Sequence, residues 1–88
     1  MVVKPGSYVK VVTYVNMFKL RVELVGRVSR LSEKLGVQFS EVIWANPEAV
    51  TTFNKHGLHW KMMYSSGTWV KYVEMKQLQE EEALGYLL

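Results

Sequence analysis

The sequence of 88 residues contains no cysteine and no aspartate. The lack of cysteine excludes a disulfide scaffold, a thiolate zinc site and a cysteine nucleophile. A chain without disulfides fits a reducing compartment, so we expect a cytoplasmic protein. No apolar run approaches the roughly 18 residues that a membrane-spanning helix needs, and no signal-peptide pattern opens the chain. These absences predict a soluble protein without membrane association.

The charge is distributed unevenly along the chain. Eleven lysines and arginines oppose eight acidic residues, which gives a net charge of +3. Three of the acidic residues are Glu80, Glu81 and Glu82, so the 11 basic and 5 acidic residues of 1–79 leave a net charge of +6. A basic body with an acidic tail indicates an anionic partner, most commonly nucleic acid. The alternative is ordinary solubility charge, since +3 is usual for a small domain.

The composition provides enough apolar material for one core. Hydrophobic residues make up 49% of the chain and aromatic residues 12%. A chain of this length forms one domain and buries about 60% of its unfolded surface. We therefore expect a single domain over residues 1–88.

The middle of the sequence is rich in valine, phenylalanine, isoleucine and tryptophan, which favour strands. It predicts two strands, 25–32 and 37–44, that fold back on each other at residues 33–36. Gly36 can adopt the left-handed conformation that this tight return needs. Glu41 breaks the alternation of inward and outward side chains, which predicts a bulge near Ser40–Glu41.

A helix over residues 20–35 competes with the first of these strands. Apolar residues recur there at spacings of four, four, three and four: Leu20, Leu24, Val28, Leu31 and Leu35. Three features favour strands instead, namely the density of β-branched residues, a central glycine at Gly26, and the absence of a capping box after Asn16.

A further strand is expected at residues 8–15, after the turn Lys4-Pro5-Gly6-Ser7. Alternation assigns one set of its side chains to the core: Val9, Val11, Thr13 and Val15. The other set is assigned to solvent: Tyr8, Lys10, Val12 and Tyr14.

Three more segments complete the expected fold. Asn46-Pro47-Glu48 carries helix-start signals, with Asn46 as the cap, and predicts one or two helical turns ended by Gly57. Residues 60–64 and 68–73 predict a hairpin around Ser65-Ser66-Gly67. Its core face is expected to hold Trp60, Met62, Tyr64, Thr68, Val70 and Tyr72, and its other face Lys61, Met63, Trp69, Lys71 and Val73. The tail, 75–88, contains good helix formers.

Short motifs resemble the opening of SH3-like small barrels, particularly the KOW type. They are Pro5-Gly6-Ser7-Tyr8-Val9-Lys10-Val11, then Gly26-Arg27-Val28, then Gly36-Val37-Gln38-Phe39. The resemblance covers residues 5–44 and, more loosely, the last hairpin, while residues 13–25 and 45–58 depart from the compact KOW unit. It implies a mostly β, SH3-like small barrel over 5–74, with a short helical insertion and a short C-terminal helix in 75–88. Such barrels commonly bind RNA, DNA or protein.

Basic residues alternate with aromatic residues on the predicted solvent faces. Aromatic rings stack with bases and nearby cations contact phosphates, so this pattern predicts a nucleic-acid interface. The candidate residues are Tyr8, Lys10, Tyr14, Arg27, Arg30, Lys61, Met63, Trp69 and Lys71. The alternative is that Trp69 and Tyr14 are half-buried beneath lysine side chains.

Signals for an enzyme are poor, and we expect neither a catalytic residue nor a cofactor. His56 and His59 are three residues apart, but a metal site needs further ligands and only Glu48 is nearby in the sequence. The serines at 65 and 66 belong to no visible catalytic triad, and the scattered glycines form no phosphate loop.

The competing functional hypothesis is a protein-interaction module, such as an adaptor or an inhibitor of a larger enzyme. Five methionines and three tryptophans suit an adaptable contact surface. The tail ends in apolar residues that must dock on this domain or on a second copy, so we also expect a homo-oligomer through Leu84, Leu87 and Leu88.

Overall fold

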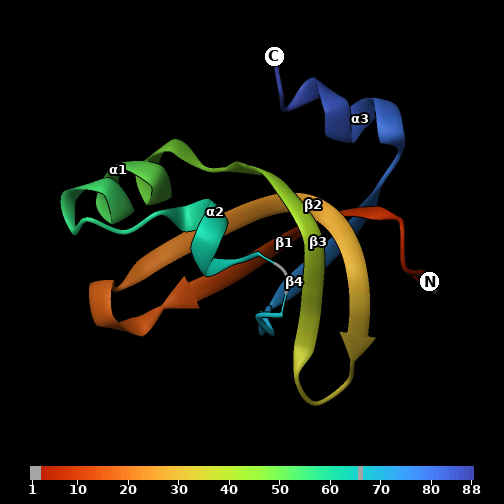
Figure 1. The fold of residues 1–88 in the computed structure, drawn as a ribbon, viewed down its shortest axis with the longest axis horizontal. Coiled ribbons are helices and arrows are strands. Elements are labelled where there is room, and N and C mark those ends of the chain that lie inside the picture. Colours follow the sequence, from red (N-terminus) through yellow and green to blue (C-terminus); the bar gives the residue numbers. More distant parts are fainter. Residues whose placement is uncertain (1–2, 66) are drawn as a thin grey trace.

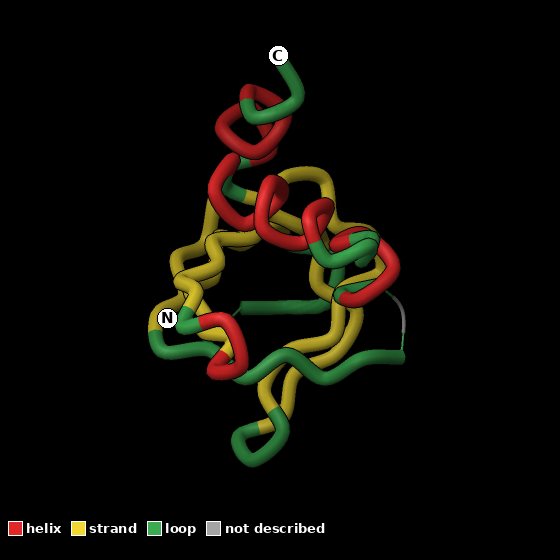
Figure 2. Tube along the Cα trace, turned by 90° about the vertical axis from the view of Figure 1, so that its left-hand side faces the viewer, coloured by secondary structure: helices red, strands yellow, loops and turns green. Residues whose placement is uncertain are grey.

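The structure, a computed structural model, describes residues 3–65 and 67–88. Its strands β1 (Tyr8–Val15), β2 (Leu20–Ser32), β3 (Gly36–Ala45) and β4 (Glu74–Leu78) form one antiparallel sheet in the order β3-β2-β1-β4 (Figure 1). The sheet is strongly curved (Figure 2), but it is not closed. The protein is therefore mostly β, and the expected barrel is not confirmed.

The helices are short. They are the 3-10 turn η1 (Asn16–Phe18) and the α-helices α1 (Pro47–Lys55), α2 (Trp60–Met63) and α3 (Glu80–Gly85). Within the ranges that the structure describes, no helix is long and apolar enough to cross a membrane.

The central hairpin is confirmed, and β2 is longer than expected. Residues 20–32 form one continuous strand, which excludes the competing helix. Arg27 pairs with Glu41 while Val28 pairs with Phe39, so Ser40 bulges out of the ladder where the broken alternation predicted it. Gly26 lets the two strands approach, because an added Cβ would lie 2.6 Å from the Glu41 carbonyl oxygen.

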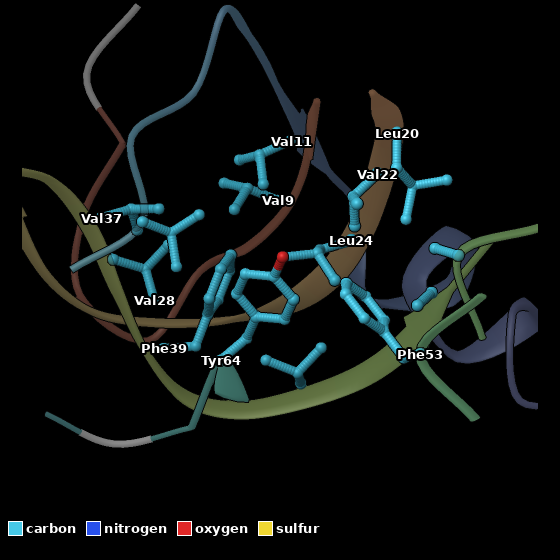
Figure 3. Packing of buried hydrophobic residues seen from close by; sticks show 14 residues of the cluster. Val9, Val11, Leu20, Val22, Leu24, Val28, Val37, Phe39, Phe53 and Tyr64 are labelled. Carbon is cyan, nitrogen blue, oxygen red and sulfur yellow. The ribbon is translucent and has the colours of Figure 1, made fainter. Parts of the chain in front are cut away.

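The main core lies on the concave face of the sheet. Val9 and Val11 of β1 point inward as expected, and the rings of Phe39, Phe53 and Tyr64 lie among the valines and leucines of the sheet (Figure 3). Phe53 of α1 meets Tyr64 edge to face, with ring centroids 6.1 Å apart. The segment from α1 through Tyr64 therefore covers the open side of the curved sheet.

The convex face holds a second, smaller cluster. Tyr8, Val25, Ile43, Leu78 and Ala83 are buried there, with Trp44 and Tyr86 packed against them. The expectation that Tyr8 and Val12 face solvent is wrong, since they are 7% and 5% exposed. Tyr8 is buried because α3 folds back over this face, which strand alternation alone does not reveal.

The predicted hairpin over residues 59–74 is wrong. Residues 60–63 form a helical turn, in which the Met63 amide donates to the His59 carbonyl at 3.0 Å. Its i, i+3, i+4 spacing turns Trp60, Met63 and Tyr64 towards the core and leaves Met62 exposed. Ser66, the middle of the expected loop, lies outside the described residues.

The chain after this turn connects the two sides of the sheet. Val70 exchanges two backbone hydrogen bonds with Val37 of β3, at 2.7 and 2.9 Å. The Val73 amide donates to the Val12 carbonyl of β1 at 2.8 Å. Residues 74–78 then pair with β1 as β4, where a helical tail was expected, and the C-terminal helix is limited to residues 80–85. Tyr72, expected in the core, is exposed.

Asn46 precedes α1 but makes no capping hydrogen bond, contrary to the prediction. Its Oδ1 accepts from the Glu23 amide at 2.8 Å, and its Nδ2 donates to the Arg21 carbonyl at 3.3 Å. The side chain therefore extends the β2–β3 ladder beyond the last residue of β3.

Candidate nucleic-acid interface

Three of the nine candidate residues meet at the end of the β2–β3 hairpin. Arg30 pairs with Gln38 across the hairpin, and the antiparallel bridge between Val37 and Val70 places Trp69 on the other side of Gln38. The Arg30 guanidinium carbon lies 5.4 Å from the Trp69 ring centroid. This arrangement is a cation–π contact between residues 39 positions apart in the sequence.

The backbone of Gly36 fixes the third of these residues, Lys71. Gly36 has a φ of +105°, and an added Cβ would collide with the carbonyl of Val70 and come within 3.0 Å of the Lys71 Cα. The absence of a side chain therefore lets residues 70–71 lie directly against the start of β3. The side chain of Lys71 is exposed.

A hollow of about 270 Å³ adjoins these residues at the hairpin turn. It is lined by Ser32, Glu33, Lys34, Gly36, Lys71 and Tyr72. Lys34 and Tyr72 were missed as site residues, although Lys34 belongs to the predicted turn and an exposed tyrosine is a usual base-stacking group. We call Arg30, Lys34, Trp69, Lys71 and Tyr72 the hairpin-end surface.

Among the described residues, the cations of the hairpin-end surface have no carboxylate partner. Over residues 3–65 and 67–88 the structure contains two ion pairs, and both involve Glu23. Glu33 lines the hollow without pairing with Lys34 or Lys71. The hollow is therefore lined by two lysines and one glutamate, and Arg30 adds a third positive charge at the nearby Trp69 ring, so the local excess of positive charge favours an anion.

Tyr8 and Arg27 form a separate pair where β1 meets α3. The Arg27 guanidinium carbon lies 4.9 Å from the Tyr8 ring centroid, and its Nη2 donates to the Tyr8 hydroxyl at 3.0 Å. Glu80 and Glu82 of α3 line the adjoining hollow of about 500 Å³. These carboxylates would repel a phosphate at this position. We therefore do not include Tyr8 and Arg27 in the hairpin-end surface.

Lys10 is already engaged within the protein. Its Nζ lies 3.0 Å from the Glu23 carboxylate and 5.7 and 5.5 Å from the ring centroids of Trp44 and Tyr86. The hydrogen bond to Glu23 raises the pKa of Lys10 and lowers the pKa of Glu23, although partial burial opposes both changes. Lys10 therefore holds α3 against the sheet rather than serving as a free phosphate contact.

The remaining candidates lie elsewhere. Tyr14 is 53% exposed and pairs with Arg21 at the far end of β1. Lys61 and Met63 belong to α2, where the Lys61 amine lies 5.6 Å from the Trp60 ring centroid and Met63 packs against the core. The expected placement of these two residues across a hairpin from Trp69 is therefore wrong.

The two histidines do not form a metal site with any described residue. The His56 ring stacks on Phe18 with a centroid distance of 4.2 Å, and its Nδ1 lies 2.8 Å from the Thr52 carbonyl oxygen. In the part of the chain that the structure describes, no three histidine, aspartate or glutamate side chains gather closely enough to hold a metal ion. His56 instead joins η1 to the end of α1.

The hairpin-end surface thus combines a shallow hollow, lined by Lys34, Lys71 and the exposed Tyr72, with the neighbouring contact between Arg30 and the half-buried Trp69. These groups can stack on planar rings and contact anions. No protein-family model matches the sequence, and no curated protein and no solved structure shows a significant match to it.

Proposed function

We propose that this protein is a non-enzymatic binding module that holds single-stranded nucleic acid on the hairpin-end surface. The observation that carries the proposal is the contact between Arg30 and Trp69 at 5.4 Å, beside Lys34 and Lys71, which make no ion pair with any residue that the structure describes. Bases stack on aromatic rings and on guanidinium planes, and each stacked base contributes about 1–3 kcal/mol. Lysines at the edge of such a platform contact the phosphates.

The geometry favours a single strand over a duplex. Tyr72 lines the hollow of about 270 Å³ and is 37% exposed, so an unpaired base can reach its ring. In a duplex the base faces are stacked on one another and are not available to a side chain. The resemblance to SH3-like barrels also supports a binding role, since such barrels commonly bind RNA, DNA or protein.

The test is fluorescence anisotropy with a labelled single strand of about 12 nucleotides, which is within the site size of an aromatic platform. Trp69→Ala should weaken binding by about 5- to 150-fold, because it removes the stacking platform. Lys34→Ala and Lys71→Ala should each reduce the slope of log K against log salt by about 0.7, because each removes one phosphate contact.

Matched controls separate binding from stability. Lys55→Ala removes an exposed lysine at the end of α1, far along the chain from the hairpin, and should leave the salt slope unchanged. Trp60→Ala should lower the melting temperature, since Trp60 packs against the core, while leaving the affinity of the folded protein intact. If Trp69→Ala and Lys71→Ala bind like the wild type while Trp60→Ala does not, nucleic acid does not bind on the hairpin-end surface.

A protein partner is the second candidate, favoured by the apolar C-terminus. Leu84 and Leu87 are 41% and 58% exposed, which is costly in water unless a partner covers them. Binding centred on these leucines would depend weakly on salt, whereas phosphate contacts give a steep dependence. Leu84→Ser and Leu87→Ser should therefore leave oligonucleotide binding unchanged and weaken any protein contact.

A further inference from the structure

The outer edge of β4 pairs with no other strand in the described part of the chain. β4 lies at the end of the sheet, with β1 on one side, and no other strand formed by residues 3–65 or 67–88 lies on its far side. An edge of this kind presents a row of backbone N–H and C=O groups that can pair with another strand. Its pairing with β1 runs without a register shift over residues 74–78, and the strand contains no proline.

The C-terminal helix leaves this edge uncovered. α3 begins at Glu80, directly after β4, but it folds inward across the sheet. Tyr86 reaches Trp44 of β3, with ring centroids 4.7 Å apart. Since β3 lies at the opposite end of the sheet, α3 runs across the convex face and away from the β4 edge.

The charged residues of β4 lie on one face of the strand. Glu74 and Lys76 pair with Val12 and Lys10 on the convex face, whereas Met75 between them packs against the main core. Both charged residues are exposed, and neither makes an ion pair in the described chain. The strand therefore carries one negative and one positive charge, two residues apart, on the same face of an open edge.

We propose that a second copy of this chain pairs antiparallel with β4 and forms a two-fold dimer with Met75 of both copies at the axis. In this register Glu74 lies opposite Lys76 of the partner subunit, and the symmetry repeats the same contact. Opposite charges directly across an antiparallel pair stabilise it, and like charges destabilise it. The two sheets then form one continuous eight-stranded sheet.

The alternative two-fold registers lack this complementarity. A dimer axis at Lys76 places two lysines directly opposite each other, and an axis at Glu74 places two glutamates opposite each other. An axis at Gln77 leaves no glutamate of β4 opposite a lysine of β4. In the Met75-centred register Val73, which is 65% exposed, lies opposite Gln77 of the partner subunit and gains cover.

Charge reversal tests this register directly. Sedimentation equilibrium from micromolar to millimolar concentration should show a concentration-dependent dimer of the wild type. Glu74→Lys and Lys76→Glu should each raise the dimer dissociation constant by at least about tenfold, because each replaces two opposite-charge contacts with two like-charge contacts. An equimolar mixture of the two variants should form a heterodimer, since mixing restores both opposite-charge contacts, and native mass spectrometry resolves the two chains.

The matched controls are Glu48→Lys and Lys55→Glu on α1, which make the same changes in net charge away from β4. Both should dimerise as the wild type does. A wild type that stays monomeric at millimolar concentration would overturn the proposal, as would charge variants that dimerise normally or fail to recover on mixing. Dimerisation that is lost on removing residues 84–88 but survives both β4 reversals would instead assign the interface to the C-terminal leucines.

Discussion

At the scale of single residues, Gly36 determines how closely two distant segments approach. Its φ of +105° lies in the region that favours glycine, and the carbonyl of Val70 occupies the space that a Cβ would need. The contact between Arg30 and Trp69 depends on this approach, because Trp69 directly precedes Val70. A backbone requirement at one glycine therefore positions the proposed binding surface.

Gly36→Ala should lower the free energy of unfolding by more than about 2 kcal/mol, measured by urea denaturation. The left-handed conformation costs an alanine about 1–2 kcal/mol, and the collision with Val70 adds to that cost. Gly57→Ala is the matched control, since Gly57 has a φ of +70° but nothing lies within 4 Å of an added Cβ. Equal losses in the two variants would show that residues 70–71 move away without cost.

Glu23 connects the acid stability of the protein to its ion pairs with Lys10 and Arg21. The hydrogen bond from Lys10 lowers the pKa of Glu23 below its ordinary value of 4.5, so folding favours the ionised carboxylate. The resulting stability is present above the ordinary pKa and is lost as the pH falls through the lower pKa of the folded state. It is small, because Glu23 is partly exposed and solvent screens the pair.

Glu23→Gln should therefore reduce the loss of stability between about pH 5 and pH 2 by up to about 1 kcal/mol. Chemical denaturation at several pH values measures this difference. Lys10→Met removes the ion pair with Glu23 from the other side and should reduce the loss of stability at low pH by a similar amount. Because both substitutions remove the same ion pair, the double variant should differ little from either single variant. Additive effects of the two substitutions would contradict a shared origin.

At the scale of elements, α3 stabilises the convex face through two residues. Ala83 is fully buried, and Tyr86 packs against Trp44, while Leu87 and Leu88 remain exposed. The capping box between Gln79 and Glu82 starts the helix immediately after β4. The docking of α3, rather than the apolar end of the chain, therefore accounts for the burial of Tyr8.

Removal of residues 83–88 should lower the melting temperature and increase the binding of a hydrophobic dye, because Tyr8, Val25, Ile43 and Leu78 lose their cover. Thermal melting and dye fluorescence measure the two effects. Removal of residues 87–88 alone should change neither, since both leucines are exposed. A chain without residues 83–88 that melts like the wild type would show that α3 contributes no net stability.

The sequence predicts elements well where local pattern and tertiary pairing agree. The β2–β3 hairpin was predictable because β-branched residues, a turn glycine and a break in alternation all indicate the same structure. The strand at 74–78 was not predictable from the sequence. Its residues are good helix formers, but in the structure they pair with the free side of β1. At 60–64, alternation and helical spacing both fit the apolar residues, and packing against the core favours the helical turn.

The candidate site was predictable in its residue types and less so in its arrangement. Arg30, Trp69 and Lys71 were identified as a base-stacking and phosphate-binding set, but their proximity depends on the long-range bridge between Val37 and Val70. Tyr72 was assigned to the core together with Val70; Val70 is buried as expected, but Tyr72 lines the hollow and is 37% exposed. Lys10 fits the pattern of a phosphate contact equally well, and its engagement by Glu23 follows from the neighbouring strand.

At the scale of the whole molecule, the two buried clusters share one sheet. Val9 and Leu24 face the main core, while their neighbours Tyr8 and Val25 face the cluster beneath α3. Residues 70–73 join the two sides of this sheet through hydrogen bonds to β3 and β1. We therefore expect both clusters and the connecting segment to unfold together.

Native-state hydrogen exchange should give the amides of Val37 and Val70 nearly the same protection as the amides at the centre of β1 and β2, because their mutual hydrogen bonds break only when the sheet opens. The Thr68 amide, which donates within a local turn to Ser65, should exchange much faster and serves as the internal reference. Rapid exchange at Val70 with slow exchange in β1 would show that the connecting segment opens independently.

The position of β4 beside β1 has a consequence for protein synthesis. Within this sequence, Val12 emerges from the ribosome 62 residues before its β4 partner Glu74. At an elongation rate of about 5–20 residues per second, the side of β1 that pairs with β4 stays unpaired for roughly 3–12 s. The nascent chain therefore carries one unpaired edge of a valine-rich strand for seconds, a period in which chaperones or other nascent chains can bind that edge.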